Sequence, residues 1–385
     1  MDFTLTEEQK AWRDKARDFA KEYIEPVAAD LDKKGEFPYD NVKRMADLGF
    51  LGMPFPKEYG GQGTDYVSYV AVVEEVAKKD ASHAIILSAN NSLVGGPILR
   101  FGTEEQKKKY LPDLCTGRKI GSFCLTEKDA GTDASRQKAT AVDMGDYYLL
   151  NADKKFITNG GISGTYIVFA MTDKSQGVKN GISAFIVEGD WEGVSTGKIE
   201  QKMGIRASQT AEMHFKDVKV PKENLLGKPG QGFWIAMDTL DGGRIGVGAQ
   251  SLGIAQEAFD LMTGYMMERE QFGVKLGKLD TLRFEVAKTK VQLDSARLLV
   301  YRAANYKDQG MSYKEAAAMA KYAASRAAVD LTRQSIQYHG GYGYMTDYPI
   351  ERMYRDAKIT EIYEGTNEVQ QMVIASCTFD VPQSK

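Results

Sequence analysis

The chain has 385 residues, 43% of them hydrophobic, which is enough to bury a large core and corresponds to two or three domains at roughly 150 residues each. Its 50 basic and 53 acidic residues leave a net charge of −3, which argues against a protein whose main task is to hold a nucleic-acid backbone. Only 3 Cys and 3 His are present, so neither a disulfide framework nor a histidine-rich metal site is expected.

Three features favour a cytoplasmic protein. The first residues, Met1-Asp2-Phe3-Thr4, lack the basic stretch and apolar run of a signal peptide. No run of about 18 apolar residues is present to cross a membrane. The few cysteines, odd in number, are typical of a reducing compartment.

Residues 1–118 have the pattern of a helical domain. Thr6 and Gln9 form a capping box, which predicts the start of a helix. Apolar residues then recur at helical spacing, and we expect Pro26 to end this run. Similar spacing predicts helices over 67–78 and 104–114, while the glycines of 60–63 indicate a loop over 54–65.

Residues 119–230 change to short runs of β-branched and aromatic residues. Turn signals such as Asn159-Gly160-Gly161 separate these runs. No strand opens onto a helix, so we expect an antiparallel barrel or sandwich and not a parallel doubly wound sheet. The predicted strands cover residues 147–151, 155–158, 166–172, 182–188 and 211–220.

Residues 231–385 return to long amphipathic patterns, over 251–269, 279–307 and 313–338. Such patterns predict antiparallel helices that form a four-helix bundle. The fold class is therefore a multidomain α+β protein with an N-terminal all-α domain, a middle β domain and a C-terminal helical bundle.

Common nucleotide and hydrolase motifs are missing, but four segments combine glycine, hydroxyl and acidic residues in ways that a core does not require. They are 125–133, 155–160, 269–273 and 362–368. On a strand, Phe156 and Thr158 share one face, where they could stack on a ring and bond to its edge. Arg269 carries a forked donor suited to a diphosphate. Each segment alone can also be an ordinary loop, strand turn or helix end.

Glu364 is the candidate general base. It lies between Tyr363 and Gly365, in a loop that enters a last helix capped by Thr366. Burial among aromatic residues raises the pKa of a carboxyl group, as a base that works near neutral pH requires. The alternative is a capping or solvated glutamate.

In this order and within this α–β–α layout, the four segments resemble the acyl-CoA dehydrogenase family over essentially the whole chain. The resemblance is closest to the short-chain, butyryl-CoA type. Four segments carry this closer resemblance: LDGGRIG (240–246), QYHGGYGY (337–344), RDAK (355–358) and IYEGTNEVQ (362–370), the last of which includes the fourth segment above.

The resemblance implies an FAD cofactor whose ring lies between the β domain and the bundle. It also implies that a neighbouring subunit holds part of each FAD, so that the protein is a homotetramer built as two dimers. The implied cofactor-binding residues are Phe123, Leu125, Thr126, Thr132, Phe156, Thr158, Arg269, Gln271, Phe272, Gln337, Gly341, Thr366 and Glu368.

The resemblance also implies the reaction. Glu364 removes the α-proton of a short-chain acyl-CoA, flavin N5 takes the β-hydrogen as hydride, and the product is the 2-enoyl-CoA. Another branch of the family carries its base at the position of Gly243. Glycine has no side chain to act as a base, so this alternative is excluded here. Electron-transferring flavoprotein is the implied electron acceptor. The implied substrate-binding residues are Thr132, Asn90, Asn91, Asp241, Arg244, Tyr363 and Gly365.

Three alternatives remain open at this point. The polar pair Asn90-Asn91 borders the implied acyl pocket, so the substrate could be a small branched or alicyclic carboxyl-CoA. The enzyme could also pass electrons to oxygen, as an acyl-CoA oxidase does. Lastly, the chain could be a helical scaffold without activity.

Overall fold

The computed structural model describes residues 4–380, and residues 1–3 and 381–385 lie outside it. The first three residues of the segment that bears on the signal-peptide prediction are therefore outside the described residues. The predicted capping box is confirmed, because Thr6 Oγ1 accepts from the Gln9 N–H at 3.2 Å and Gln9 Oε1 accepts from the Thr6 N–H at 2.9 Å. The N-terminal helices are α1 (Glu7–Phe19), α2 (Glu25–Lys34), α3 (Tyr39–Asp47), α4 (Tyr66–Lys79), α5 (Ala81–Ser88), α6 (Gly96–Phe101) and α7 (Glu104–Cys115).

The expectation that Pro26 ends the first helical run is wrong. A π-helical turn, Ala20–Ile24, joins α1 to α2, and Pro26 lies in the first turn of α2. A proline is tolerated in a first turn because its missing N–H needs no partner there. Gly35, at φ 67°, ends α2 instead.

The middle domain contains the predicted strands. They form a sheet in the order β6-β7-β3-β2-β4-β5-β8, with β1 beside β4. The two runs predicted at 147–151 and 155–158 are one strand, β3, with irregular register near Lys154 and Ile157. The strands are β1 (Gly121–Cys124), β2 (Thr140–Asp143), β3 (Tyr147–Thr158), β4 (Thr165–Met171), β5 (Ile182–Glu188), β6 (Val194–Ile199), β7 (Thr210–Pro221) and β8 (Leu225–Leu226), with the short helix α8 (Gly177–Gly181) before β5.

This sheet is mixed and not wholly antiparallel. Both β1 and β2 run parallel to β4, with Gly121 opposite Thr165 and Thr140 opposite Met171. Long connections separate these strands in sequence, and only such connections allow parallel pairing. Turn signals between neighbouring strands therefore could not reveal it.

The C-terminal domain is the predicted helical bundle, but its first helix starts at Gly232 and not near Ser251. The glycines at 242, 243, 246 and 248 weaken the helix signal of this segment, whereas close packing against other elements requires several of them. The elements are α9 (Gly232–Glu268), the hairpin β9 (Glu270–Gln271) and β10 (Val274–Lys275), α10 (Asp280–Asp308), α11 (Lys314–His339), α12 (Ile350–Thr360) and α13 (Asn367–Phe379).

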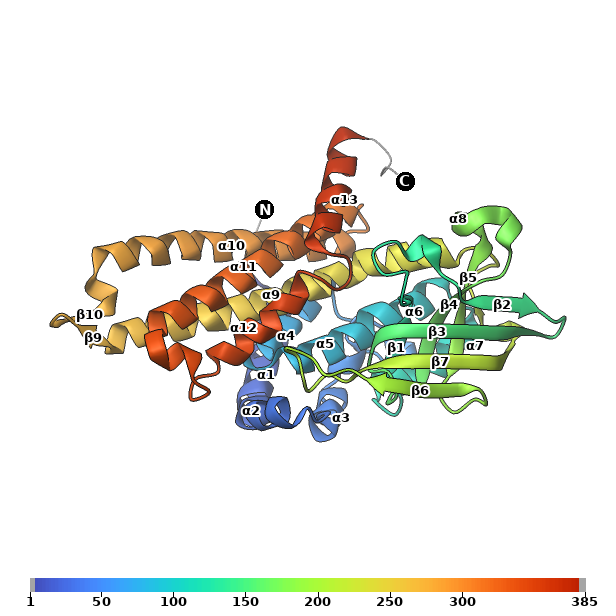
Figure 1. The fold of residues 1–385 in the computed structure, drawn as a ribbon, viewed down its shortest axis with the longest axis horizontal. Helices are drawn as coiled ribbons and strands as arrows, with labels where there is room; N and C mark the ends of the chain where they lie inside the picture. Colours follow the sequence, from blue (N-terminus) through green and yellow to red (C-terminus); the bar gives the residue numbers. More distant parts are fainter. Residues whose placement is uncertain (1–3, 381–385) are drawn as a thin grey trace.

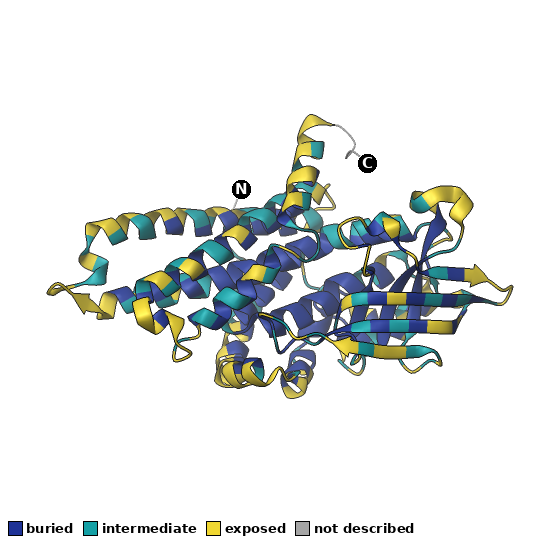
Figure 2. Ribbon diagram, in the orientation of Figure 1, coloured by how far each residue is buried: buried dark blue, intermediate teal, exposed yellow. Residues whose placement is uncertain are grey.

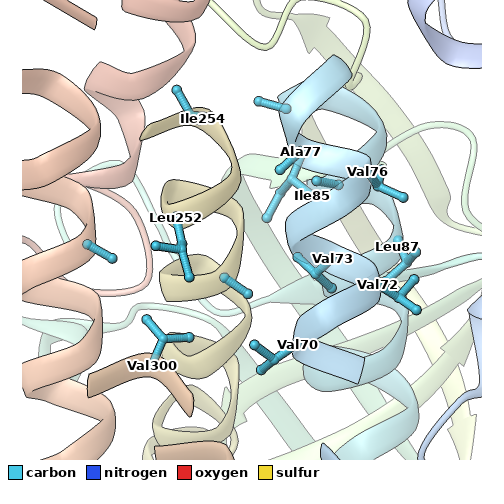
Figure 3. Close-up of a cluster of buried hydrophobic side chains, with 14 of the residues drawn as sticks. Val70, Val72, Val73, Val76, Ala77, Ile85, Leu87, Leu252, Ile254 and Val300 are labelled. Atoms are coloured by element: carbon cyan, nitrogen blue, oxygen red, sulfur yellow. The ribbon is translucent and has the colours of Figure 1, made fainter. Parts of the chain in front are cut away.

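Helix α9 runs from the β domain to the β9–β10 hairpin at the opposite end of the molecule (Figure 1). Buried residues concentrate where α4, α5 and α9 meet (Figure 2). There Val70 and Val73 of α4 lie near Leu252 of α9 and Val300 of α10 (Figure 3). One hydrophobic core therefore joins the N-terminal helices to the bundle.

In the described part of the chain, no helix combines the length and apolar character needed to span a membrane. Residues 4–380 also contain no group of three or more His, Cys, Asp or Glu placed to hold a metal ion.

Candidate active site

Glu364 lies in a tight turn between α12 and α13. Both Glu364 and Gly365 have left-handed backbone conformations, with φ 53° and 95°. This region is costly for a glutamate, and such strain persists only where surrounding contacts fix the backbone. Thr366 ends the turn as the N-cap of α13, because its Oγ1 accepts from the Val369 N–H at 3.4 Å.

Side chains from α9 and α13 hold this turn. Arg244 Nε donates to the Glu364 carbonyl at 3.4 Å, and Gln370 Nε2 donates to the Gly365 carbonyl at 2.8 Å. The hydroxyl of Tyr363 donates to Gln250 Oε1. These bonds link each residue of the strained turn to a buried side chain of α9 or α13, so the direction of the Glu364 side chain is fixed.

The carboxylate of Glu364 is buried against α9 at Gly243. A Cβ atom at Gly243 would lie 2.1 Å from Glu364 Oε2, so only glycine leaves room for it. Neither carboxylate oxygen accepts a hydrogen bond from any described residue. Burial raises the pKa of Glu364 to about 7, while the positive charges of Arg244 and Lys321 act in the opposite direction. A buried carboxyl group with a pKa near neutrality and without a hydrogen-bond partner has the properties that a general base requires.

Asp241 and Arg244, the residues expected at a coenzyme A entrance, form an ion pair at 2.5 Å between Asp241 Oδ1 and Arg244 Nη1. The side chain of Arg244 is almost fully buried, and burial raises the pKa of Asp241. The pair therefore supports the turn that carries Glu364.

The residues expected around a flavin ring come together on the β domain. The Thr126 carbonyl accepts from the Lys155 N–H at 2.8 Å, which places Leu125 and Thr126 beside β3. Phe156 has φ 59° within the irregular part of β3 and is 60% exposed. Irregular strand positions of this kind redirect a side chain, and here they leave an aromatic ring free to contact a ligand.

The other residues expected on this side are near the same strands. Ser122 Oγ donates to the Thr158 carbonyl at 2.7 Å, so β1 lies beside the end of β3. Phe123 packs edge-on against Phe169, with ring centroids 4.9 Å apart. Thr132 is exposed on the loop between β1 and β2.

A second group of expected cofactor residues lines a cleft at the far end of α9. Arg269, Gln271, Gln337 and Gly341 border this cleft, whose volume is about 680 Å³. His339, which had no assigned role, forms part of its wall: it stacks on Tyr265 with centroids 4.3 Å apart. Phe272 is 95% exposed at the tip of the β9–β10 hairpin.

The cleft lies far from Glu364 along α9. Glu364 contacts α9 at Gly243 and the cleft begins at Tyr265, a separation of about 33 Å at 1.5 Å per helical residue. Thr366 and Glu368 lie at the start of α13, which is remote from the β9–β10 hairpin (Figure 1). One chain thus presents separate parts of the expected cofactor site.

Asn90 and Asn91, expected beside the acyl pocket, use their amides on backbone groups. Asn90 Nδ2 donates to the Leu51 and Leu114 carbonyls at 3.1 and 3.3 Å, and its Oδ1 accepts from the Gly121 N–H at 3.1 Å. Asn91 Nδ2 donates to the Phe50 and Leu87 carbonyls. Both residues are fully buried in a π-helical turn. The amide of Asn90 and the Nδ2 of Asn91 thus satisfy buried backbone groups, whereas Asn91 Oδ1 has no partner among the described residues.

Sequence reasoning missed two buried lysines. Lys154 of β3 binds Glu127 Oε1 at 2.9 Å and the Leu125 carbonyl at 3.2 Å beneath the loop after β1. Lys321 of α11 is fully buried near Glu364. The signal for Lys321 was its place on a helical face of small residues that includes Ala317, Ala324 and Ala328, because lysine is rarely buried there without a partner.

Family models for the acyl-CoA dehydrogenase N-terminal, middle and C-terminal domains match residues 6–118, 122–218 and 230–378. A short-chain specific acyl-CoA dehydrogenase of Clostridium acetobutylicum is 53% identical over 379 residues, which cover 98% of this chain and 100% of that protein.

Solved structures agree with this match. The butyryl-CoA dehydrogenase of Megasphaera elsdenii is 50% identical with a TM-score of 0.96, over 98% of this chain and 100% of that one. A chain from the structure of the electron transferring flavoprotein of Acidaminococcus fermentans is 53% identical with a TM-score of 0.96, over 98% of this chain and 99% of that one. With three domain models in order and about half of the residues shared along the full length, this chain belongs to the acyl-CoA dehydrogenase family.

Proposed function

We propose that the protein is an FAD-dependent dehydrogenase that converts a short-chain acyl-CoA to the 2-enoyl-CoA, with Glu364 as the base that accepts the α-proton. The observation that carries the proposal is the buried carboxylate of Glu364. It packs against Gly243 and has no hydrogen-bond partner among the described residues. Relatives about 50% identical along the whole chain are short-chain and butyryl-CoA dehydrogenases. The comparisons do not favour an oxidase, a branched or alicyclic substrate, or an inactive scaffold.

The chemistry requires a base that is partly ionised at neutral pH and close to the substrate. A carboxyl group with a pKa of about 7 is half ionised there and is strong enough to take a proton that an adjacent carbonyl acidifies. The strained turn and the bonds from Arg244 and Gln370 hold it in one direction. Fixed geometry of this kind supplies much of an enzyme's rate enhancement.

FAD is the cofactor of this family, and the residues present fit it. The exposed ring of Phe156 can cover a flat ring system, and the half-buried Thr126 and Thr158 add hydroxyl groups on the same side. In the cleft, Arg269 offers a forked donor for a diphosphate, and nothing lies within 4 Å of a Cβ at Gly341. When bound, FAD supplies the acceptor for the β-hydride.

We also propose that each FAD is shared between subunits of a homotetramer. Support comes from the distance of about 33 Å along α9 between Glu364 and the cleft, which a single FAD does not bridge. Phe272, exposed at a hairpin tip beside the cleft, is placed to reach a neighbouring chain. Thr366 and Glu368 would complete the adenosine side.

Electron-transferring flavoprotein is the proposed electron acceptor. Support comes from the 53% identical chain found in the structure of the electron transferring flavoprotein of Acidaminococcus fermentans. The proposed setting is cytoplasmic fatty acid metabolism, in keeping with an acyl-CoA substrate.

The test is anaerobic bleaching of the flavin by a panel of linear, branched and alicyclic acyl-CoA thioesters. We expect butyryl-CoA to bleach the flavin fastest and longer or branched chains to react more slowly. A purified protein without flavin absorption, or one that no thioester reduces, would contradict the proposal. Reoxidation of the reduced flavin in air, followed by stopped flow, separates a dehydrogenase from an oxidase, because a dehydrogenase reacts slowly with oxygen.

A further inference from the structure

Lys321 is a fully buried lysine that the reaction does not use directly. It lies in α11 on the face formed by Ala317, Ala324 and Ala328, and none of its surface is exposed. Burial of an ammonium group is costly unless other groups compensate for it. Among the described residues, no carboxylate lies within 4.0 Å of Lys321 Nζ, so a direct ion pair does not explain its burial.

The one hydrogen bond of its amine to a described residue leads to the turn that carries Glu364. Lys321 Nζ donates to Asn367 Oδ1 at 3.0 Å, and Ser325 Oγ donates to the same oxygen at 3.0 Å. The N–H of Asn367 donates to the Glu361 carbonyl at 2.9 Å, which closes the turn that contains Glu364. Lys321 is thus joined through one buried amide to the ends of this strained segment.

Charge gives a second connection. The carboxylate of Glu364 stabilises the charged form of Lys321, while burial lowers the pKa of Lys321 to about 7. The other charges that act on Lys321 are Arg244, on α9, and Glu361 and Glu368, of which Glu368 is exposed and Glu361 pairs with Lys358.

Few charged or titratable groups face Glu364. From the packed helices, Arg244 of α9 and Lys321 of α11 favour its ionised form. The phenols of Tyr69, on α4, and Tyr363 stay neutral near it, since burial raises the pKa of both. Arg244 already binds Asp241, so Lys321 is the cation near Glu364 that lacks a carboxylate of its own.

We infer that Lys321 is a positioning residue for Glu364: its amine anchors the turn that carries Glu364 through Asn367, and its positive charge favours the ionised form of the buried carboxylate. The inference rests on the proposed role of Glu364 as the base. It assigns two separable effects to one side chain, one of geometry and one of charge.

The experiment compares the pH dependence of kcat/KM for butyryl-CoA in the holoenzyme and in Lys321→Met, Lys321→Arg and Asn367→Ala. Without the charge of Lys321, the Glu364 carboxylate is harder to ionise. In Lys321→Met, the acid limb of the profile, where kcat/KM falls as Glu364 takes up a proton, should therefore move upward by about one pH unit. At pH values below the limb this shift is about a tenfold loss of kcat/KM. Lys321→Arg should return the limb to within about 0.3 unit of the wild type. Asn367→Ala keeps the charge and should lower kcat/KM equally at every pH.

Lys43→Met, at an exposed lysine of α3 that pairs with Asp47, is the matched control and should leave the profile unchanged. The inference is overturned if the limb of Lys321→Met stays within 0.2 unit of the wild type, or if the loss is uniform over pH, as for a residue that only supports packing. Flavin content and Tm establish that each variant is folded. If Lys321→Met does not fold, Lys321→Gln, which keeps a donor for Asn367 without the charge, should show the same displaced limb.

Glu364→Gln in the same assay separates the two claims. If it keeps wild-type turnover, the proposed base fails. If it is inactive while the limb of Lys321→Met does not move, only the role of Lys321 fails.

Discussion

At the scale of single residues, the site depends on one glutamate and the glycine opposite it. Glu364 adopts a left-handed backbone conformation that directs its carboxylate toward α9, and Gly243 leaves the space that the carboxylate occupies. Three hydrogen bonds between the turn and the buried side chains of Arg244, Gln250 and Gln370 maintain this arrangement. Activity should therefore respond to small changes at either residue.

Replacement of the base should separate flavin binding from chemistry. We expect Glu364→Gln to keep FAD and to lose flavin reduction by butyryl-CoA by about 10³-fold or more, since an amide cannot accept the α-proton. The measurement is the anaerobic bleaching rate at 450 nm. A rate like that of the wild type would show that another group is the base.

The same variant should be more stable in alkaline solution. The pKa of Glu364 is raised from 4.5 to about 7 in the folded chain, so the folded state holds a proton that the unfolded state has released. Stability is therefore lost as pH rises between these two values, by up to about 3 kcal/mol above pH 7. Glu364→Gln has no such penalty, and its stability advantage over the wild type should grow from pH 5 to pH 8 in urea unfolding. An advantage that does not change with pH would contradict this assignment.

A methyl group at position 243 should disturb the base. In Gly243→Ala the new Cβ would lie 2.1 Å from Glu364 Oε2 and 2.8 Å from Leu93 Cδ2, so the carboxylate must move. Displacement by about 1 Å lowers kcat by roughly 10²-fold. Gly264→Ala on the same helix is the control, because nothing lies within 4 Å of its Cβ, and it should keep full activity. Equal activity of both variants would exclude a steric role for Gly243.

At the scale of elements, the loop between β1 and β2 is held by a buried ion pair. Lys154 of β3 binds Glu127 and the Leu125 carbonyl, and Glu127 also accepts from the N–H groups of Lys138 and Ala139. The loop carries Leu125, Thr126 and Thr132, so its shape decides whether these residues can meet a flavin. Their grouping follows from contacts between segments far apart in sequence.

Loss of this lysine should loosen the loop and release FAD. Lys154→Met leaves Glu127 without its buried cation, a change that destabilises by about 3–5 kcal/mol. We expect a lower Tm and a lower ratio of flavin to protein. Lys138→Met, which removes an exposed ion pair with Asp129 in the same loop, should cost less than about 1 kcal/mol. If the two variants retain the same flavin content, the buried pair does not organise this loop.

At the scale of the whole molecule, α10 presents an unpaired apolar stripe. Phe284, Val291 and Leu298 follow one another every seven residues and are 66%, 67% and 53% exposed. Residues at this spacing lie on one side of a helix, and large exposed apolar side chains aligned in this way are typical of an interface. Within the proposed tetramer, another subunit would cover it.

Charges on this stripe should reduce the size of the assembly. We expect the double variant Val291→Glu and Leu298→Glu to sediment as a smaller species than the wild type, because carboxylates cannot be buried in an apolar contact. Met144→Glu, at an isolated exposed methionine of the β domain, should not change the mass. A wild-type mass for the double variant in analytical ultracentrifugation would place the interface elsewhere.

Much of the fold was predictable because its signals are local. The capping box of Thr6 and Gln9, the N-cap at Thr366 and the alternating strands all depend on residues within a few positions of one another. The parallel pairing of β1 and β2 with β4 was not predictable, because it depends on how distant segments return to one sheet. The first half of α9 was missed because its glycines are required by packing and not by helix propensity.

For the site, the sequence by itself determined the family resemblance and the candidate base, since Glu364 stands in a short motif whose residues act on one another directly. Only the tertiary structure decided the pKa of this proposed base, because burial raises it and the opposing charges are Arg244 of α9 and Lys321 of α11, both more than 40 residues away in the chain. The same holds for Asn90, whose amide proved to satisfy distant backbone groups. Burial is a property of packed elements, and a sequence pattern records which residues can be buried but not what they will face.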